Sequence, residues 1–138
     1  AALRLAKPGP YQLQAAIAAC HATAADAADT DWADIAALYG RLARMVPSGV
    51  VKLNRAVAVG MADGPAAGLA LVEEIEVAGE LAGYYLLPAT RADLLRRLGR
   101  SNEAADAYRE ALGLAATDAE RRYFARRLAA SEREGGDM

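Results

Sequence analysis

The residue types on which most catalytic and metal sites depend are scarce in this sequence. Among 138 residues there is one cysteine, Cys20, and one histidine, His21. A single cysteine excludes an intramolecular disulfide and is expected of a protein in the reducing cytoplasm. Neighbouring side chains on a helix point about 100° apart, so Cys20 and His21 cannot work as nucleophile and base. We expect Cys20 to be a small core residue and His21 a partly exposed one.

Recognisable catalytic motifs are absent as well. The sequence contains no glycine-rich phosphate loop, no metal-ligand spacing and no nucleophile elbow. We therefore expect no enzymatic activity and no cofactor, metal or small-molecule substrate. Four aspartates do cluster, at Asp26, Asp29, Asp31 and Asp34. Carboxylates favour the positive end of a helix, so we expect these residues to cap the next helix rather than to bind a cation.

Neither a strong net charge nor a long hydrophobic run is present. The net charge of −2 gives no electrostatic basis for nucleic-acid binding by the whole chain. No apolar run approaches the roughly 18 residues of a membrane span, and no signal peptide is expected. Arginine supplies the only concentrated charge. We expect neighbouring glutamates to neutralise these arginines on a solvent-exposed face; the alternative is that the arginines bind an acidic partner. These arginines are Arg96, Arg97, Arg100, Arg121, Arg122, Arg126 and Arg127.

Alanine and leucine at helical spacing are what the sequence has in abundance. Between Arg91 and Leu112, a Leu-rich face leads to Gly99, which supplies the positive φ that ends a helix. Ser101 is positioned to cap the next helix, where small residues flank Tyr108. This small–aromatic–small pattern after a Leu-Gly turn resembles the tetratricopeptide repeat, a helix pair of about 34 residues that buries its apolar face against neighbouring pairs.

The same patterns predict an all-α fold of about seven antiparallel helices. One strand alternative arises at residues 50–61, which are rich in valine, but their length and helical flanks favour a helix. We expect three degenerate tetratricopeptide-like pairs and a seventh, capping helix, forming one domain over residues 10–133. Residues 1–9 would end a linker, 24–30 would form another, and 134–138 would be a disordered tail. The expected helices cover about 10–23, 32–46, 49–61, 65–75, 84–98 (or from Leu87), 101–115 and 119–132.

Several segments together resemble a more specific family. They are 9–19 (GPYQLQAAIAA), 20–22 (CHA), 30–39 (TDWADIAALY), 53–59 (LNRAVAV), 63–69 (DGPAAGL) and 94–100 (LLRRLGR). They resemble the C-terminal region of bacterial RNA polymerase sigma factors of the extracytoplasmic-function (ECF) type that carry a long tetratricopeptide-like extension. The resemblance spans about residues 9–128, and the first segment is its most specific part.

The resemblance implies a role in transcription initiation for the parent protein. Promoter DNA and polymerase core would be bound by upstream domains that are not in this chain, and this cytoplasmic piece would regulate them by contacting those domains, polymerase or another protein. The alternative is a stand-alone tetratricopeptide-like scaffold that binds peptides. The resemblance also implies a set of candidate partner-binding residues, although these residues could instead cap helices or pack between them. The candidates are Tyr11, Gln12, Gln14, Asn54, Arg55, Arg97 and Arg100.

Overall fold

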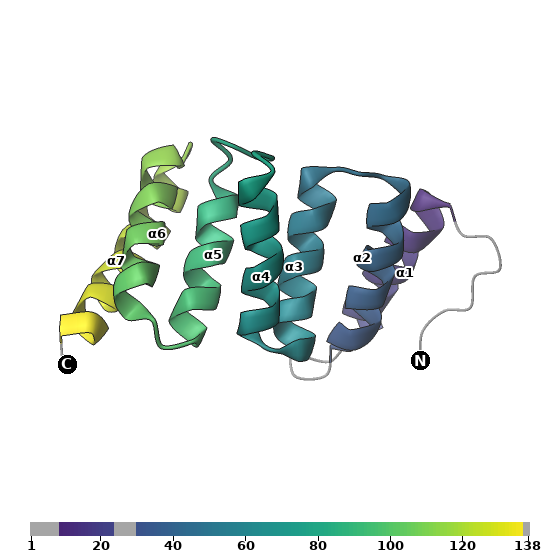
Figure 1. The fold of residues 1–138 in the computed structure, drawn as a ribbon, viewed down its shortest axis with the longest axis horizontal. Helices are drawn as coiled ribbons and strands as arrows, with labels where there is room; N and C mark the ends of the chain where they lie inside the picture. The colour runs from purple at the N-terminus through teal and green to yellow at the C-terminus, as the bar shows by residue number, and fades with distance from the viewer. Residues whose placement is uncertain (1–8, 24–29, 137–138) are drawn as a thin grey trace. The chain divides into compact units, whose positions relative to one another are not determined.

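The part of the chain that the structure describes, residues 9–23 and 30–136, is all helical and has no strand. In this computed structural model (Figure 1) its seven helices are α1 (Pro10–Thr23), α2 (Trp32–Met45), α3 (Gly49–Asp63), α4 (Pro65–Val77), α5 (Leu86–Arg97), α6 (Ser101–Leu114) and α7 (Asp118–Gly136). They divide into two compact units, one ending at Leu71 and the other beginning at Val72. The all-α prediction and the helical interpretation of residues 50–61 are confirmed.

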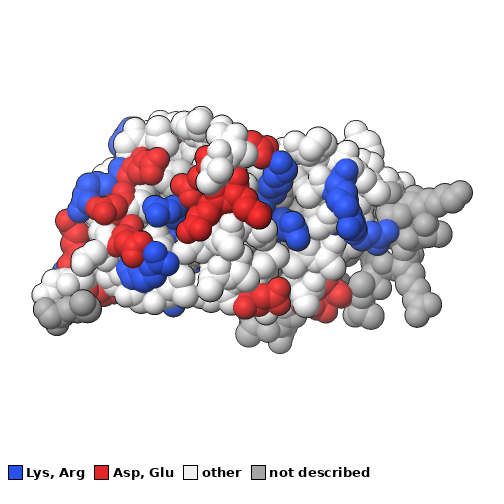
Figure 2. Space-filling model, in the orientation of Figure 1, with Lys and Arg blue, Asp and Glu red and all other residues white. Residues whose placement is uncertain are grey.

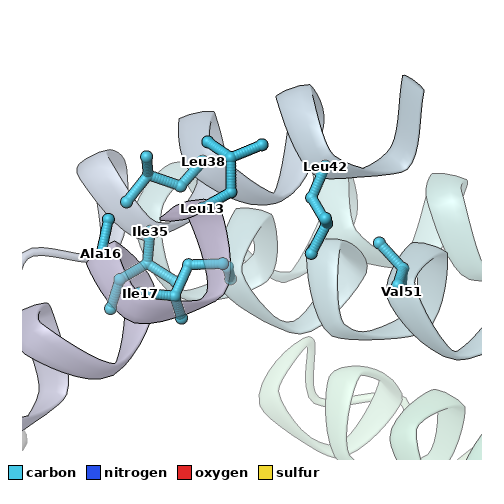
Figure 3. Close-up of a cluster of buried hydrophobic side chains, with 8 residues drawn as sticks. Leu13, Ala16, Ile17, Ile35, Leu38, Leu42 and Val51 are labelled. Carbon is cyan, nitrogen blue, oxygen red and sulfur yellow. The ribbon is translucent and has the colours of Figure 1, made fainter. Parts of the chain in front are cut away.

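Helix α2 is the central layer of the first unit, with α1 and α3 packed on it. Figure 3 shows the core that they share, in which α2 contributes Ile35, Leu38 and Leu42. Its start is fixed as expected, because the Asp31 carboxylate accepts a hydrogen bond from the backbone N–H of Asp34 at 3.1 Å. The other two predicted aspartates, Asp26 and Asp29, and most of the expected linkers at 1–9 and 24–30 lie outside the described residues.

Helices α3 and α4 approach each other closely through two glycines. A Cβ added at Gly68 would lie 2.8 Å from the carbonyl oxygen of Ala56 and 2.9 Å from the Cα of Gly60. Gly60 and Gly68 are both buried. Backbone atoms therefore occupy the space that a side chain on α4 would need, so this crossing depends on the missing Cβ.

The second unit contains the predicted helix hairpin. Leu94 and Leu95 of α5 are buried, and Tyr108 of α6, only 2% exposed, lies between Ala104 and Ala111, which are fully buried. Gly99 has φ of 76°, as predicted for the turn. The predicted capping role of Ser101 is wrong. Arg100 occupies the N-cap position, and the Ser101 hydroxyl instead hydrogen-bonds a carboxylate oxygen of Glu134 at 3.3 Å.

The predicted ends of several helices differ from the structure, and the start of α5 and the end of α7 have a physical explanation. Helix α5 begins at Leu86, two residues after the expected start at Tyr84 and one before the alternative start at Leu87. Pro88 therefore lies in the first turn, where its missing N–H costs little. Helix α7 runs to Gly136, so residues 134–136 are helical and not a disordered tail. Contacts with α6 account for this extension, because Arg109 forms an ion pair with Glu132 at 3.0 Å and Ser101 bonds Glu134.

Packing between consecutive helices fits tetratricopeptide-like pairs. Contacts join α1 to α2 and α5 to α6, and α3 meets α4 at the two glycines. Helix α7 packs on α6, as expected of a terminal capping helix. Among the described residues, none of the helices combines the length and the apolar character needed to cross a bilayer.

The start of α7 is held by a capping box. The Glu120 backbone N–H donates to the Thr117 hydroxyl at 3.1 Å, and the Glu120 carboxylate accepts from the Thr117 N–H at 3.2 Å and the Ala116 N–H at 2.9 Å. The N–H of Ala116 is the main cause that lowers the pKa of Glu120 below its usual 4.5. Thr117 is therefore the N-cap residue of α7.

Substituting Gly68→Ala should destabilise the first unit by about 1–3 kcal/mol, because the new methyl group meets backbone atoms that cannot rotate away. Urea unfolding followed by circular dichroism measures the change. The matched control is Gly113→Ala in α6, where nothing lies within 4 Å of an added Cβ. That control should be neutral or stabilising by up to about 1 kcal/mol. Equal effects of both substitutions would contradict the close crossing.

Because the folded-state pKa of Glu120 is lowered, its contribution to stability is present above pH 4.5 and is lost as the pH falls through the folded value. Glu120→Ala should therefore destabilise the protein at pH 7 and have a much smaller effect at pH 3. Urea unfolding of both proteins at the two pH values tests this. A difference that does not change with pH would show that the carboxylate charge does not contribute.

Candidate functional site

A cavity of about 400 Å³ opens between α1, α2 and α3 in the first unit. Helix α1 lines it with residues at positions i, i+3, i+4 and i+7, which share one face of a helix. The residues from α1 are Gln14, Ile17, Ala18 and His21; those from α2 are Tyr39 and Leu42; those from α3 are Val50, Val51 and Asn54. The local helical periodicity of α1 thus builds one wall of the site.

The cavity has an apolar floor and an uncharged polar rim. Ile17, Leu42 and Val51 are buried, whereas Gln14 and Asn54 are exposed. None of its nine lining residues is an Asp, Glu, Lys or Arg. Burial raises the pKa of Tyr39, so its hydroxyl stays protonated at neutral pH and can donate a hydrogen bond. Amide and hydroxyl groups above an apolar floor suit a neutral polar ligand such as a peptide backbone.

Two of the seven predicted site residues meet at this cavity, namely Gln14 and Asn54. The others do not line it. Tyr11 is 85% exposed at the start of α1. The Gln12 side-chain oxygen accepts a hydrogen bond from the Gly9 N–H at 3.0 Å, which is a local role at the helix start. Arg55 lies on α3 beside Gly40 of α2, outside the cavity.

The remaining two predicted residues belong to the second unit. Arg97 is exposed at the end of α5. Arg100 makes two hydrogen bonds to the Glu103 carboxylate, at 2.9 and 2.6 Å, and lowers the pKa of that carboxyl. It also borders a smaller cavity of about 160 Å³. Its charge is therefore already matched within the chain, which favours a structural role.

Cys20 and His21 face different surroundings, as their adjacency predicted. Cys20 is partly buried against the core of the first unit. Burial, followed by the nearby charges of Asp34 and Asp31, raises the pKa of the thiol, which keeps it protonated and unreactive at neutral pH. The exposed His21 ring meets Trp32 edge to face, with centroids 5.5 Å apart. Within residues 9–23 and 30–136, no group of three or more His, Cys, Asp or Glu could hold a metal ion.

The sequence interpretation missed the roles of His21 and Tyr39 as lining residues. A signal for His21 was present, because it follows Gln14 by two helical turns and so shares its face. No local signal marked Tyr39, since its position on the cavity depends on how α1 and α3 pack over α2.

The exposure of Gln14 and Asn54 predicts that they are dispensable for folding. The double substitution Gln14→Ala and Asn54→Ala should change the free energy of unfolding by no more than about 0.5 kcal/mol. By contrast, Ile17→Ala on the same cavity wall should cost about 2–5 kcal/mol because its side chain is buried. Thermal and urea unfolding compare the variants. A large loss from the double substitution would assign these two residues a structural role.

The chain is similar in sequence to another protein. No family model matches the chain. An uncharacterized protein of Rhizobium meliloti (strain 1021) is 48% identical over 128 residues. The match covers 92% of this chain and 30% of the relative, so the chain spans less than a third of the length of the protein that it resembles.

Proposed function

We propose that this chain is a protein-interaction domain that regulates an ECF-type sigma factor, in which other domains bind promoter DNA and RNA polymerase. The observation that carries the proposal is the cavity of the first unit, which brings together Gln14 and Asn54, two residues that the resemblance to these sigma factors marks. They come from different helices and meet only in the folded structure.

Two further observations support this proposal. The fold consists of tetratricopeptide-like helix pairs, a type of architecture whose stacked helices present extended binding surfaces. The Rhizobium relative extends well beyond the matched region, which is the relation expected between an appendage and a multidomain protein.

The chemistry of the cavity defines how the domain would act. The side-chain amides of Gln14 and Asn54 can each donate to a carbonyl and accept from an N–H of a bound segment. An apolar side chain of that segment would fill the floor between Ile17 and Leu42. A segment of the upstream sigma domains or of polymerase bound there would be held against this domain, and its release or capture would control initiation.

The uncharged rim also supports a second candidate, a stand-alone scaffold that binds peptides through the same cavity. The two candidates differ in the occupant. A regulatory domain binds a segment from its own parent protein or from polymerase, whereas a scaffold binds unrelated peptides and leaves transcription unchanged.

The test is association in trans between this chain and purified upstream domains of the parent protein, measured by co-purification and isothermal titration calorimetry. We expect a complex that Gln14→Ala with Asn54→Ala weakens about tenfold, since two hydrogen bonds are each worth about 0.5–1.5 kcal/mol. The matched control is Gln12→Ala, whose side chain bonds Gly9 outside the cavity. Absence of a complex, together with unchanged promoter-dependent transcription after deletion of residues 9–132, would overturn the regulatory proposal.

A further inference from the structure

The hairpin formed by α2 and α3 carries basic residues without acidic ones. From Ile35 to Ala62 the sequence contains four basic residues and no Asp or Glu. The four are Arg41 and Arg44 on α2 and Lys52 and Arg55 on α3. From Asp63 onward, acidic residues are interspersed with the basic ones, so this stretch departs from the overall charge of −2.

Packing of the two helices brings the three arginines onto one surface. Helices α2 and α3 are neighbours in space, and a Cβ added at Gly40 would lie 3.6 Å from the Nε of Arg55. Arg55 therefore reaches across to the part of α2 that carries Arg41. Figure 2 shows Lys and Arg side chains over α2 and α3 with no acidic side chain between them. Lys52 interacts with another part of the chain, so we give the name basic hairpin surface to the three arginines alone, Arg41, Arg44 and Arg55.

Half of the ten arginines of the second unit are paired with carboxylates of the chain, unlike the three arginines of the hairpin. There, five arginines lie within 4 Å of a carboxylate: Arg91, Arg96, Arg100, Arg109 and Arg121. On the hairpin, Arg41, Arg44 and Arg55 have no such ion pair with any described residue. Their charges repel one another and remain available to a partner of opposite sign.

Helix stabilisation accounts for only part of this arrangement. Arg44 lies in the last turn of α2, where a cation is favourable. Lys52 is near the start of α3, where a cation opposes the helix dipole, and Arg41 and Arg55 are within their helices. The cluster as a whole is thus not explained by capping.

We infer that the basic hairpin surface binds an acidic segment of a partner protein. Guanidinium groups bind carboxylates with paired hydrogen bonds, and Met45, 45% exposed beside Arg41 and Arg44, offers an apolar contact. A protein fits better than a nucleic acid, because the chain has an isoelectric point near 5.4, whereas nucleic-acid-binding domains are strongly basic. None of the three arginines lines the cavity, so this surface is additional to the proposed function and does not depend on it.

The test uses a fluorescein-labelled peptide of eight glutamates and the complete chain, with binding followed by fluorescence anisotropy. The triple substitution Arg41→Gln, Arg44→Gln and Arg55→Gln should weaken binding about tenfold, as expected for three exposed charge pairs. The matched control is Arg122→Gln, Arg126→Gln and Arg133→Gln on α7, which removes the same charge from another exposed helix face. Binding to this control should stay within about twofold of the wild-type value.

Three results would overturn the inference. They are no binding of the glutamate peptide to the wild-type chain, equal weakening by both triple variants, and tighter binding of an eight-nucleotide DNA strand than of the peptide. The last would assign the surface to nucleic acid. Circular dichroism checks that each variant is folded, and the single substitution Arg44→Gln, at an exposed position, replaces the triple if that variant unfolds. If this chain fails to associate with the upstream domains of the parent protein, that result contradicts the proposal for the cavity and does not affect the peptide-binding result for the basic hairpin surface.

Discussion

Close approach of helices through small side chains is the constraint on which the rest of this structure depends. Alanine and glycine bury little surface each, so a helix contact made through them is stable only where the backbones come near enough for many weak contacts. The fully buried Ala104 and Ala111 beside Tyr108, and Gly68 against Gly60, show the two forms this takes. In the first form, the ring of Tyr108 fills the space between small residues. In the second, the two helix backbones are so close that no space for a side chain remains.

Features of the fold that depend on a few neighbouring residues were predicted correctly, and features that depend on distant residues were not. Pro10, Pro65 and Gly99 act within a few residues, and the helix boundaries that they mark agree with the structure. The end of α7 was misplaced because Gly135 and Gly136 suggest a break locally, whereas contacts between Glu134 and α6 hold the helix together. Interactions between distant segments are not visible in a local pattern.

In the candidate site, too, individual residues were predicted but the contacts between distant segments were not. Gln14 and Asn54 were predicted from a resemblance, but the sequence could not tell that they meet, since the cavity exists only where α1 and α3 pack over α2. The basic stretch from Ile35 to Ala62 could have been predicted from the sequence, because it contains no Asp or Glu. It was missed because the net charge of the whole chain, −2, hides it. Arg100 was predicted to bind a partner, and the structure shows its charge matched by Glu103.

Packing between consecutive helices also determines how the chain can fold. The main helix contacts within each unit join neighbours in sequence, so every contact closes only a short loop and costs little chain entropy. Proteins with such local contacts fold in microseconds to milliseconds. During synthesis, the helices up to α3 can therefore pack before the second unit has left the ribosome, and the cavity that they enclose is complete at that stage.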